Sequence, residues 1–143
     1  MNTVETEAGT RKIVTIQDAP QHCTAERQPD GNTVAIDCPH TGKGEEFSPT
    51  NLVEAALGGC MLLSMGTLAK RNGQNIEGTK IEVKVTMTDE PRMRFGSIDV
   101  VVTMPPGLAD KDRARLERAA GLCPVKHSFD PDIPISVHYV YPQ

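Results

Sequence analysis

The sequence predicts an α+β fold in which most strands pair in antiparallel fashion. Several short segments place apolar residues at every second position, as half-buried strands do, and a long apolar segment, 48–73, is bounded like a helix. A second helical segment, 109–122, precedes the last alternating segment, which gives the order ββ-α-ββ-α-β. At 143 residues the chain is expected to form a single domain, 1–143, with residues 1–10 as a flexible arm.

Two short strands are expected before the long helix. Their segments are Ile13 to Ile16 and Thr33 to Asp37. Residues 29–32 (PDGN) combine turn-forming types and predict a turn that leads into the second strand. A polar loop over 42–46 then connects this strand to the helix.

The long helix has clear signals at both ends. Ser48 suits the N-cap, Pro49 suits the first helical position, and Gly73 suits the C-terminal stop. Lys70 and Arg71 lie in the last turn, where positive charge favours the helix dipole. Apolar residues fall on most sides between these ends, which predicts a helix buried nearly all round. Because one small sheet cannot enclose such a helix, the pattern favours dimerisation.

Two strands, a helix and a final strand are expected after it. Apolar and polar residues alternate over 81–87 and again over 98–104, so each strand should have one buried and one exposed face. Residues 105–107 (PPG) end the second of these strands. The helix over 109–122 carries its apolar residues on one side, and 135–141 alternates as the last strand.

Composition and charge argue against several classes of function. The formal net charge is −4, and the 15 Lys and Arg are scattered, whereas nucleic acids and anionic membranes bind basic patches. Residues 1–10 hold two glutamates and no apolar run, unlike a secretory signal peptide. The longest apolar stretch, 55–63, falls short of the roughly 20 residues of a membrane span. We therefore expect a cytoplasmic protein without nucleic-acid or membrane partners, whose four cysteines are thiols, ligands or redox groups.

Cys60 lies in the middle of the long helix and has two interpretations. A buried cysteine is most often a small apolar core residue. Gly58 and Gly59 beside it favour a functional interpretation, since each glycine costs up to about 1 kcal/mol in a helix interior relative to alanine. Such a cost suggests that a packed backbone or a ligand approaches closely there.

Cys123 directly precedes Pro124, and this order also leaves two interpretations. Proline disfavours helix at the preceding residue and suits the first position of a new helix, so Cys123 would cap a short helix over 124–129. A sulfur at that end lies near a positive dipole, which lowers the thiol pKa. The alternative is plain core packing beside Leu116 and Ala120.

The other two cysteines have histidine neighbours, a combination that suggests a metal site. Cys23 follows His22 in the sequence. Cys38 lies two residues before His40. The spacing contains neither Cys-x-x-Cys nor His-x-x-x-His, so no metal is expected. Residues 41–43 (TGK) look like the end of a phosphate loop but lack its first glycine and its hydroxyl.

Two segments together are typical of one family: residues 48–60 (SPTNLVEAALGGC) and residues 122–125 (LCPV). On these motifs the chain, over about residues 30–141, resembles the family of osmotically inducible protein C and the organic hydroperoxide resistance proteins. The resemblance implies an intertwined homodimer in which two mostly antiparallel sheets surround two central helices.

The resemblance also implies a thiol peroxidase that acts on organic hydroperoxides in oxidative-stress defence. The cysteine matching Cys60 attacks the peroxide oxygen and becomes a sulfenic acid. The cysteine matching Cys123 condenses with it to a disulfide, which a dithiol such as a lipoyl group reduces. The partners implied are therefore a second subunit, a small hydroperoxide and a dithiol reductant, with no cofactor.

The chain differs from the well-studied branches of that family at the groups that hold the thiolate. Those branches place a glutamate after the helix-starting proline and partner it with an arginine, whereas this chain has Thr50 there and no arginine at the end of the second strand. Glu54 is no simple substitute, because six residues of helix turn it about 120° away from Cys60. The groups expected to support Cys60 instead are Thr50, His40, Glu46, Arg92 and Arg94.

Three hypotheses for the function follow. The first is reduction of organic hydroperoxides through the pair Cys60 and Cys123, favoured by the presence of both cysteines. The second is a related protein without peroxidase activity that binds a small apolar molecule at the dimer interface, favoured by the missing carboxylate. The third is a structural dimer whose buried cysteines are inert.

Overall fold

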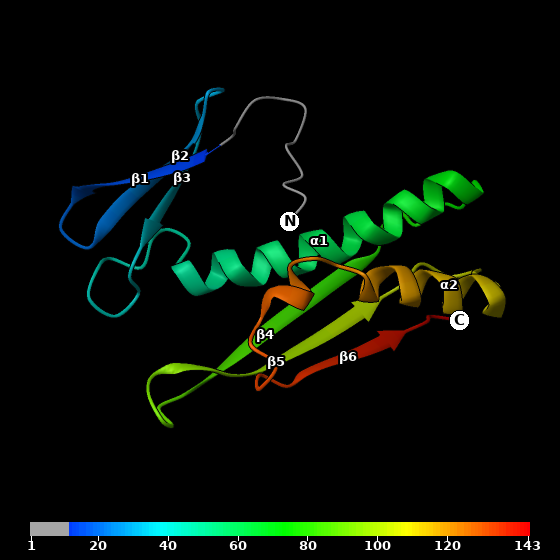
Figure 1. Cartoon of the computed structure of the whole chain (residues 1–143). Helices are drawn as coiled ribbons and strands as arrows, with labels where there is room; N and C mark the ends of the chain where they lie inside the picture. Colours follow the sequence, from blue (N-terminus) through cyan, green and yellow to red (C-terminus); the bar gives the residue numbers. More distant parts are fainter. Residues whose placement is uncertain (1–11) are drawn as a thin grey trace, which may run out of the picture. The chain divides into compact units, whose positions relative to one another are not determined.

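The computed structural model describes residues 12–143 and contains two compact units, Met1–Leu52 and Val53–Gln143 (Figure 1). The expected arm over 1–10 lies outside the described residues. The elements, in order, are β1 (Lys12–Ala19), β2 (His22–Gln28), β3 (Asn32–Asp37), α1 (Pro49–Asn72), β4 (Lys80–Thr88), β5 (Arg94–Thr103), α2 (Asp110–Gly121), the 3₁₀ helix η1 (Lys126–Ser128) and β6 (Ile135–Val140). The α+β class is confirmed.

The first unit is built on an antiparallel sheet in the order β1-β2-β3. The sequence predicted β1 and β3 but missed β2, so the predicted order ββ-α-ββ-α-β is wrong by one strand. The segment of β2, HCTAERQ, has one buried residue, Ala25, and polar residues at most of its other positions. β2 is held mainly by its backbone hydrogen bonds to β1 and β3. Its sequence therefore lacks the alternation of apolar residues by which a strand is predicted.

The turn between β2 and β3 forms where the sequence predicts it. The Gly31 N–H donates to the Arg27 carbonyl (2.7 Å), and Gly31 has a φ of +77°. The Arg27 guanidinium pairs with the Asp30 carboxylate inside the same turn. Glycine adopts this left-handed conformation without the steric cost that a side chain would bring.

Helix α1 begins and ends at the predicted residues. The Asn51 N–H donates to Ser48 Oγ, and the Ser48 N–H donates to the Asn51 side-chain oxygen, each at 3.1 Å. This reciprocal pair satisfies backbone donors that have no partner within the helix. Gly73 ends the helix with a φ of +67°. The predicted N-cap and stop are confirmed.

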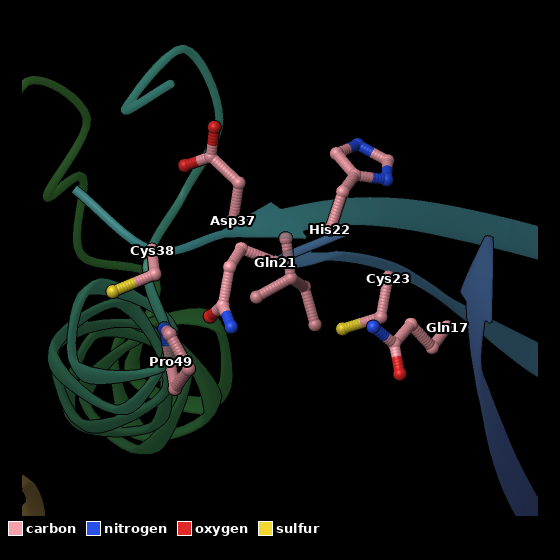
Figure 2. A pocket seen from close by; sticks show the side chains of 8 residues that line it. Gln17, Gln21, His22, Cys23, Asp37, Cys38 and Pro49 are labelled. Carbon is pink, nitrogen blue, oxygen red and sulfur yellow. The ribbon is translucent and has the colours of Figure 1, made fainter. Parts of the chain in front are cut away.

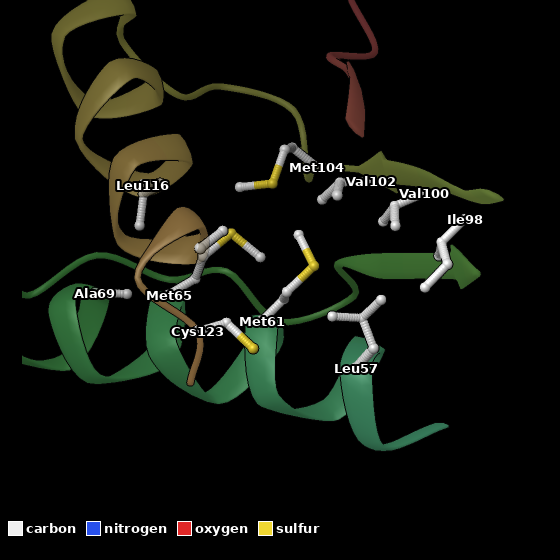
Figure 3. Close-up of a cluster of buried hydrophobic side chains, with 11 residues drawn as sticks. Leu57, Met61, Met65, Ala69, Ile98, Val100, Val102, Met104, Leu116 and Cys123 are labelled. Atoms are coloured by element: carbon white, nitrogen blue, oxygen red, sulfur yellow. The ribbon is translucent and has the colours of Figure 1, made fainter. Parts of the chain in front are cut away.

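The second unit contains the sheet β4-β5-β6, in which β4 and β5 are antiparallel and β5 and β6 are parallel. Its core lies between this sheet and the two helices, and Figure 3 shows methionine and leucine side chains of the helices meeting the valines of β5. The fully buried members of the core are Leu57, Met61, Met65, Ala69, Ile98, Val100, Val102, Met104, Leu116, Ala120 and Cys123. The strands expected over 81–87 and 98–104 are thus confirmed.

Helix α1 buries one side in this core and leaves another side exposed. Its buried positions are Leu57, Gly58, Met61, Met65 and Ala69. Leu63, between them in sequence, is 75% exposed. Burial nearly all round is therefore not achieved within one chain. The helix is long and apolar enough to cross a membrane by composition, a property that core helices share.

Candidate functional site

Cys60 lies midway along α1, where its half-buried side chain borders an open hollow of about 520 Å³. We call this the thiol hollow. Its lining is mostly small and apolar, and consists of Ala55, Ala56, Gly59, Cys60, Leu63, Ser64 and Thr67. These residues recur every three or four positions, so they share one face of the helix. A small apolar molecule can therefore reach the Cys60 sulfur from this face.

The two glycines beside Cys60 face different surroundings. A methyl group on Gly58 would stand 3.5 Å from side-chain carbons of Ile81 and Val83, so this glycine lets α1 pack closely on β4. A methyl group on Gly59 would meet nothing within 4 Å. The close approach expected from the sequence at Gly58 is thus that of α1 to β4 within the chain. Gly59, in contrast, keeps the thiol hollow open beside Cys60.

Cys123 lies just after α2 and is fully buried. The Lys126 N–H points at its sulfur (N···Sγ 3.4 Å), and the His127 N–H donates to its carbonyl (3.2 Å). Cys123 therefore caps the turn that leads into η1, as the sequence predicted. The predicted helix over 124–129 is shorter than expected, because only Lys126–Ser128 has helical structure of the 3₁₀ type.

Cys60 packs against the core cluster that contains Cys123, close enough for its side chain to affect the pKa of the Cys123 thiol. Burial raises the pKa of Cys123, the neighbouring Cys60 side chain raises it further, and the Lys126 N–H opposes both effects. The sequence predicted a lowered pKa at this capping position, and that prediction is wrong. One N–H at the start of a three-residue turn does not offset full removal of the sulfur from water.

The Glu54 side chain of α1 is hydrogen-bonded to the neighbouring strand β4. Its Oε1 accepts a hydrogen bond from the Val85 N–H of β4 (3.0 Å). Val85 belongs to an edge strand, whose outward N–H groups need partners. The prediction that Glu54 does not stand in for the family glutamate agrees with this placement.

The five residues expected to support Cys60 are distributed over both units. In the second unit, Arg94 Nε donates to the Glu90 carbonyl (3.3 Å) and Arg92 is exposed in the connection between β4 and β5. In the first unit, His40 and Glu46 are exposed in the segment before α1, and Thr50 is half-buried in the first helical turn. Which group activates Cys60 stays a prediction.

The first unit contains a cavity lined by two cysteines, which the sequence analysis did not predict. A cavity of about 350 Å³, the Cys38 cavity, is lined by Gln17, Gln21, His22, Cys23, Ile36, Asp37, Cys38 and Pro49 (Figure 2). The sequence signal for this cavity is the alternation of side chains on paired strands. It can be used only when β2 is recognised as a strand. Within residues 12–143 no three His, Cys, Asp or Glu side chains are grouped as metal ligands.

Comparison with known proteins decides the family. The model of the family described as OsmC-like protein matches residues 42–138, which include both Cys60 and Cys123. The chain belongs to the OsmC-like protein family. Among curated proteins none matches this OsmC-like chain.

Solved structures agree with this OsmC-like assignment. A proposed osmotic stress induced and detoxification response protein from Psychrobacter arcticus 273-4 is 31% identical over 92% of this chain and 96% of its own, with a TM-score of 0.84. The OsmC like protein from Mycoplasma pneumoniae (13% identity, 95% and 99% coverage, TM-score 0.79) has the same fold. So does the organic hydroperoxide resistance protein OhrB of Bacillus subtilis (19% identity, 91% and 97% coverage, TM-score 0.66).

Proposed function

We propose that this OsmC-like protein reduces organic hydroperoxides through Cys60 and Cys123 and so serves the response to oxidative stress. The observation that carries the proposal is the neighbouring pair of thiols in one core, of which one borders an open apolar hollow and the other is buried. The names of similar proteins, which refer to detoxification and to organic hydroperoxide resistance, support the same class of function.

The first step takes place at the accessible sulfur. The Cys60 thiolate attacks the terminal peroxide oxygen, an S–O bond forms, and the O–O bond breaks. The alkoxide that leaves takes a proton and departs as an alcohol, while Cys60 is left as a sulfenic acid. The apolar lining of the thiol hollow favours a hydroperoxide with a hydrocarbon group over hydrogen peroxide, because burial of that group is favourable.

The second step uses the buried sulfur. Cys123 attacks the Cys60 sulfenic acid, the S–S bond forms, and the S–O bond breaks with release of hydroxide, which becomes water. The packing of Cys60 against the core that contains Cys123 supports this step, because the step requires the two sulfurs to be neighbours. A dithiol then reduces the disulfide by two exchange steps, so that both protein thiols are restored and the reductant leaves as its own disulfide.

Two copies of the chain would enclose the exposed side of α1. This side contains Leu63, which is 75% exposed, together with the exposed Ala55 and Ala56. Large exposed apolar side chains that share a helix face mark contact surfaces. We infer a homodimer in which the α1 helices of the two subunits meet on this face and close the thiol hollow from solvent.

A second function is favoured by one specific feature. The family glutamate after the helix-starting proline is Thr50 here, so a charged group that helps hold the thiolate is missing. The thiol hollow would still accept a small apolar molecule without it. In that case the protein binds such a molecule and does not turn it over.

A coupled assay distinguishes the two functions. Cumene hydroperoxide is supplied with dihydrolipoamide, and peroxide consumption is followed for wild type, Cys60→Ser and Cys123→Ser, with Cys23→Ser as the matched control. The peroxidase proposal expects loss of turnover in the first two variants and wild-type turnover in the control. Peroxide consumption that persists in Cys60→Ser, or is absent in wild type while cumyl alcohol binds, contradicts it; the second result favours the binding function.

A further inference from the structure

We propose that Gly59 is a specificity-determining residue of the peroxide reaction proposed above, on which this inference rests. Gly59 joins the thiol hollow to a second apolar groove. A long-chain hydroperoxide without charge on its hydrocarbon arm then reacts at Cys60 while the arm lies in that groove. No bond-making step at the two sulfurs requires a glycine at this position.

The second groove lies between α1 and the edge strand β4, and we call it the β4 groove. It has a volume of about 230 Å³ and is lined by Glu54, Ala55, Gly58, Gly59, Leu62, Ile81 and Val83. Ala55 and Gly59 also line the thiol hollow, so the two spaces share a border at these residues. A molecule that occupies both spaces therefore crosses small residues only.

Helical geometry places this border beside the reactive sulfur. At about 3.6 residues per turn, successive side chains are about 100° apart, so Gly59 lies about 100° round α1 from Cys60 and Gly58 about 100° further. Gly58 faces Ile81 and Val83 of β4, whose side-chain carbons lie 3.5 Å from the position of an added methyl group. The path round the helix from Cys60 to the β4 groove therefore crosses Gly59, where α1 presents only backbone.

Packing within the chain does not require a glycine at this position. A methyl group on Gly59 would meet nothing within 4 Å, and glycine is less favourable than alanine in a helix interior. A side chain here would instead stand on the path between the thiol hollow and the β4 groove. Gly66, seven residues further along α1 and on nearly the same side, is equally open but lines neither space. It is thus a matched control position.

The lining of the β4 groove suits a hydrocarbon arm. Leu62, Ile81 and Val83 supply apolar side chains, and burial of hydrocarbon against them is favourable. Within residues 12–143, Glu54 is the one charged residue of this lining, and the Val85 N–H donates to its Oε1 (3.0 Å). A carboxylate at the end of the arm would meet this like charge. The repulsion acts on the end of the arm and not on the reacting oxygens.

The test measures how fast Cys60 is oxidised in the full chain. Reduced protein is mixed with butyl or dodecyl hydroperoxide, both primary and both below the concentration at which they form micelles. It is then blocked with iodoacetamide and digested with trypsin, and mass spectrometry follows the loss of alkylated peptide 44–70, which holds Cys60. Each rate is divided by that of N-acetylcysteine with the same hydroperoxide, which removes the intrinsic reactivity of the reagent.

Two graded variants, Gly59→Ala and Gly59→Leu, are compared with wild type and with the control Gly66→Leu. We expect the normalised dodecyl rate of wild type to exceed the butyl rate at least tenfold. This ratio should fall at least fivefold in Gly59→Leu, take an intermediate value in Gly59→Ala and keep its wild-type value in Gly66→Leu. Urea unfolding should show both Gly59 variants to be at least as stable as wild type, because alanine and leucine favour a helix more than glycine does.

The charge of the arm is tested with ω-hydroperoxydodecanoic acid and its methyl ester. At pH 7 and low salt the ester should oxidise Cys60 at least fivefold faster than the acid. Glu54→Gln should at least halve this preference, and so should added salt, which screens the repulsion. Equal rates for acid and ester in wild type contradict the role given to Glu54.

The two hydroperoxides separate the specificity of Gly59 from the peroxidase function. Failure of butyl and dodecyl hydroperoxide alike to oxidise Cys60 in wild type overturns the function, and the specificity falls with it. Oxidation by both reagents with a ratio that is unchanged in Gly59→Leu overturns the specificity alone. An equal loss of the ratio in Gly66→Leu also overturns it, since contact between helices would then be the cause.

Discussion

Cys60 packs against the core that contains Cys123, although one lies midway along α1 and the other follows α2. Packing of the two helices in one core, through Met61 and Leu116 among others, brings these positions together. Burial raises the pKa of Cys123 and so favours its protonated form. Cys60 is half-buried and borders the thiol hollow, so it is the more accessible of the two thiols.

Replacement of the buried cysteine should separate the two steps of the proposed reaction. In Cys123→Ser, we expect Cys60 still to be oxidised by one equivalent of cumene hydroperoxide, while turnover with dihydrolipoamide falls by about 100-fold or more. Without a resolving thiol, excess peroxide carries the Cys60 sulfenic acid on to sulfinic acid. Mass spectrometry of peptide 44–70 measures the oxidation state. A stable sulfenic acid in wild type, equal to that in the variant, would show that Cys123 does not resolve it.

Stability should fall on the alkaline side of neutrality. Burial raises the pKa of Cys123, and burial followed by the hydrogen bond to Glu117 raises the pKa of Tyr141. Each folded-state pKa is above the unfolded value, so folding favours the protonated group, and this contribution is present below the unfolded-state pKa and lost as the pH rises through the folded-state pKa. Urea unfolding from pH 7 to 10.5 should show a free energy of unfolding that declines above about pH 8.5, the ordinary thiol value.

Two variants test this assignment. Cys123→Ala should remove the part of the decline that begins near the thiol range, and Tyr141→Phe should remove part of the decline at higher pH. A free energy of unfolding that stays constant with pH in wild type, or declines equally in both variants, contradicts it.

The carboxylate of Glu54 should matter for stability and not for peroxide chemistry. Glu54→Ala leaves the Val85 N–H of the β4 edge without its acceptor, and loss of a partner at a half-buried donor costs about 1–3 kcal/mol. Glu54→Gln keeps a side-chain oxygen and should cost less than half as much. Urea denaturation measures both. A cost that is the same for the two variants would show that the hydrogen bond to Val85 is not its source.

A charge on the exposed side of α1 should dissociate the inferred homodimer. Leu63→Lys places an ammonium group where two copies would meet, and burial of an unpaired charge is strongly unfavourable. The matched control is Leu122→Lys, since Leu122 is 70% exposed and lies outside α1. Sedimentation at micromolar concentration should show a monomer for the first variant and a dimer for the control. A wild-type chain that sediments as a monomer would exclude the homodimer.

The elements with strong local signals were predictable from the sequence. The ends of α1 depend on Ser48 and Gly73, whose roles are set by the backbone next to them, and alternation alone located β4 and β5. β2 was missed because it has only one buried residue, Ala25, and one such residue gives no apolar alternation.

The candidate site was predictable only in part, because burial and long-range register decide it. The motifs indicated Cys60 and Cys123, but the direction of the Cys123 pKa depends on packing that no local pattern shows. The grouping of Cys23 and Cys38 around one cavity likewise depends on strand pairing, not on spacing along the chain.

The most direct test of the proposed function is the disulfide that one turnover should leave behind. Wild-type protein is reduced, mixed with one equivalent of cumene hydroperoxide, blocked with an alkylating reagent and digested with trypsin. We predict that peptide 44–70 is linked to peptide 119–126, while peptides 13–27 and 28–43 are recovered alkylated. Recovery of Cys60 and Cys123 as free thiols, with the hydroperoxide unconsumed, would contradict the account.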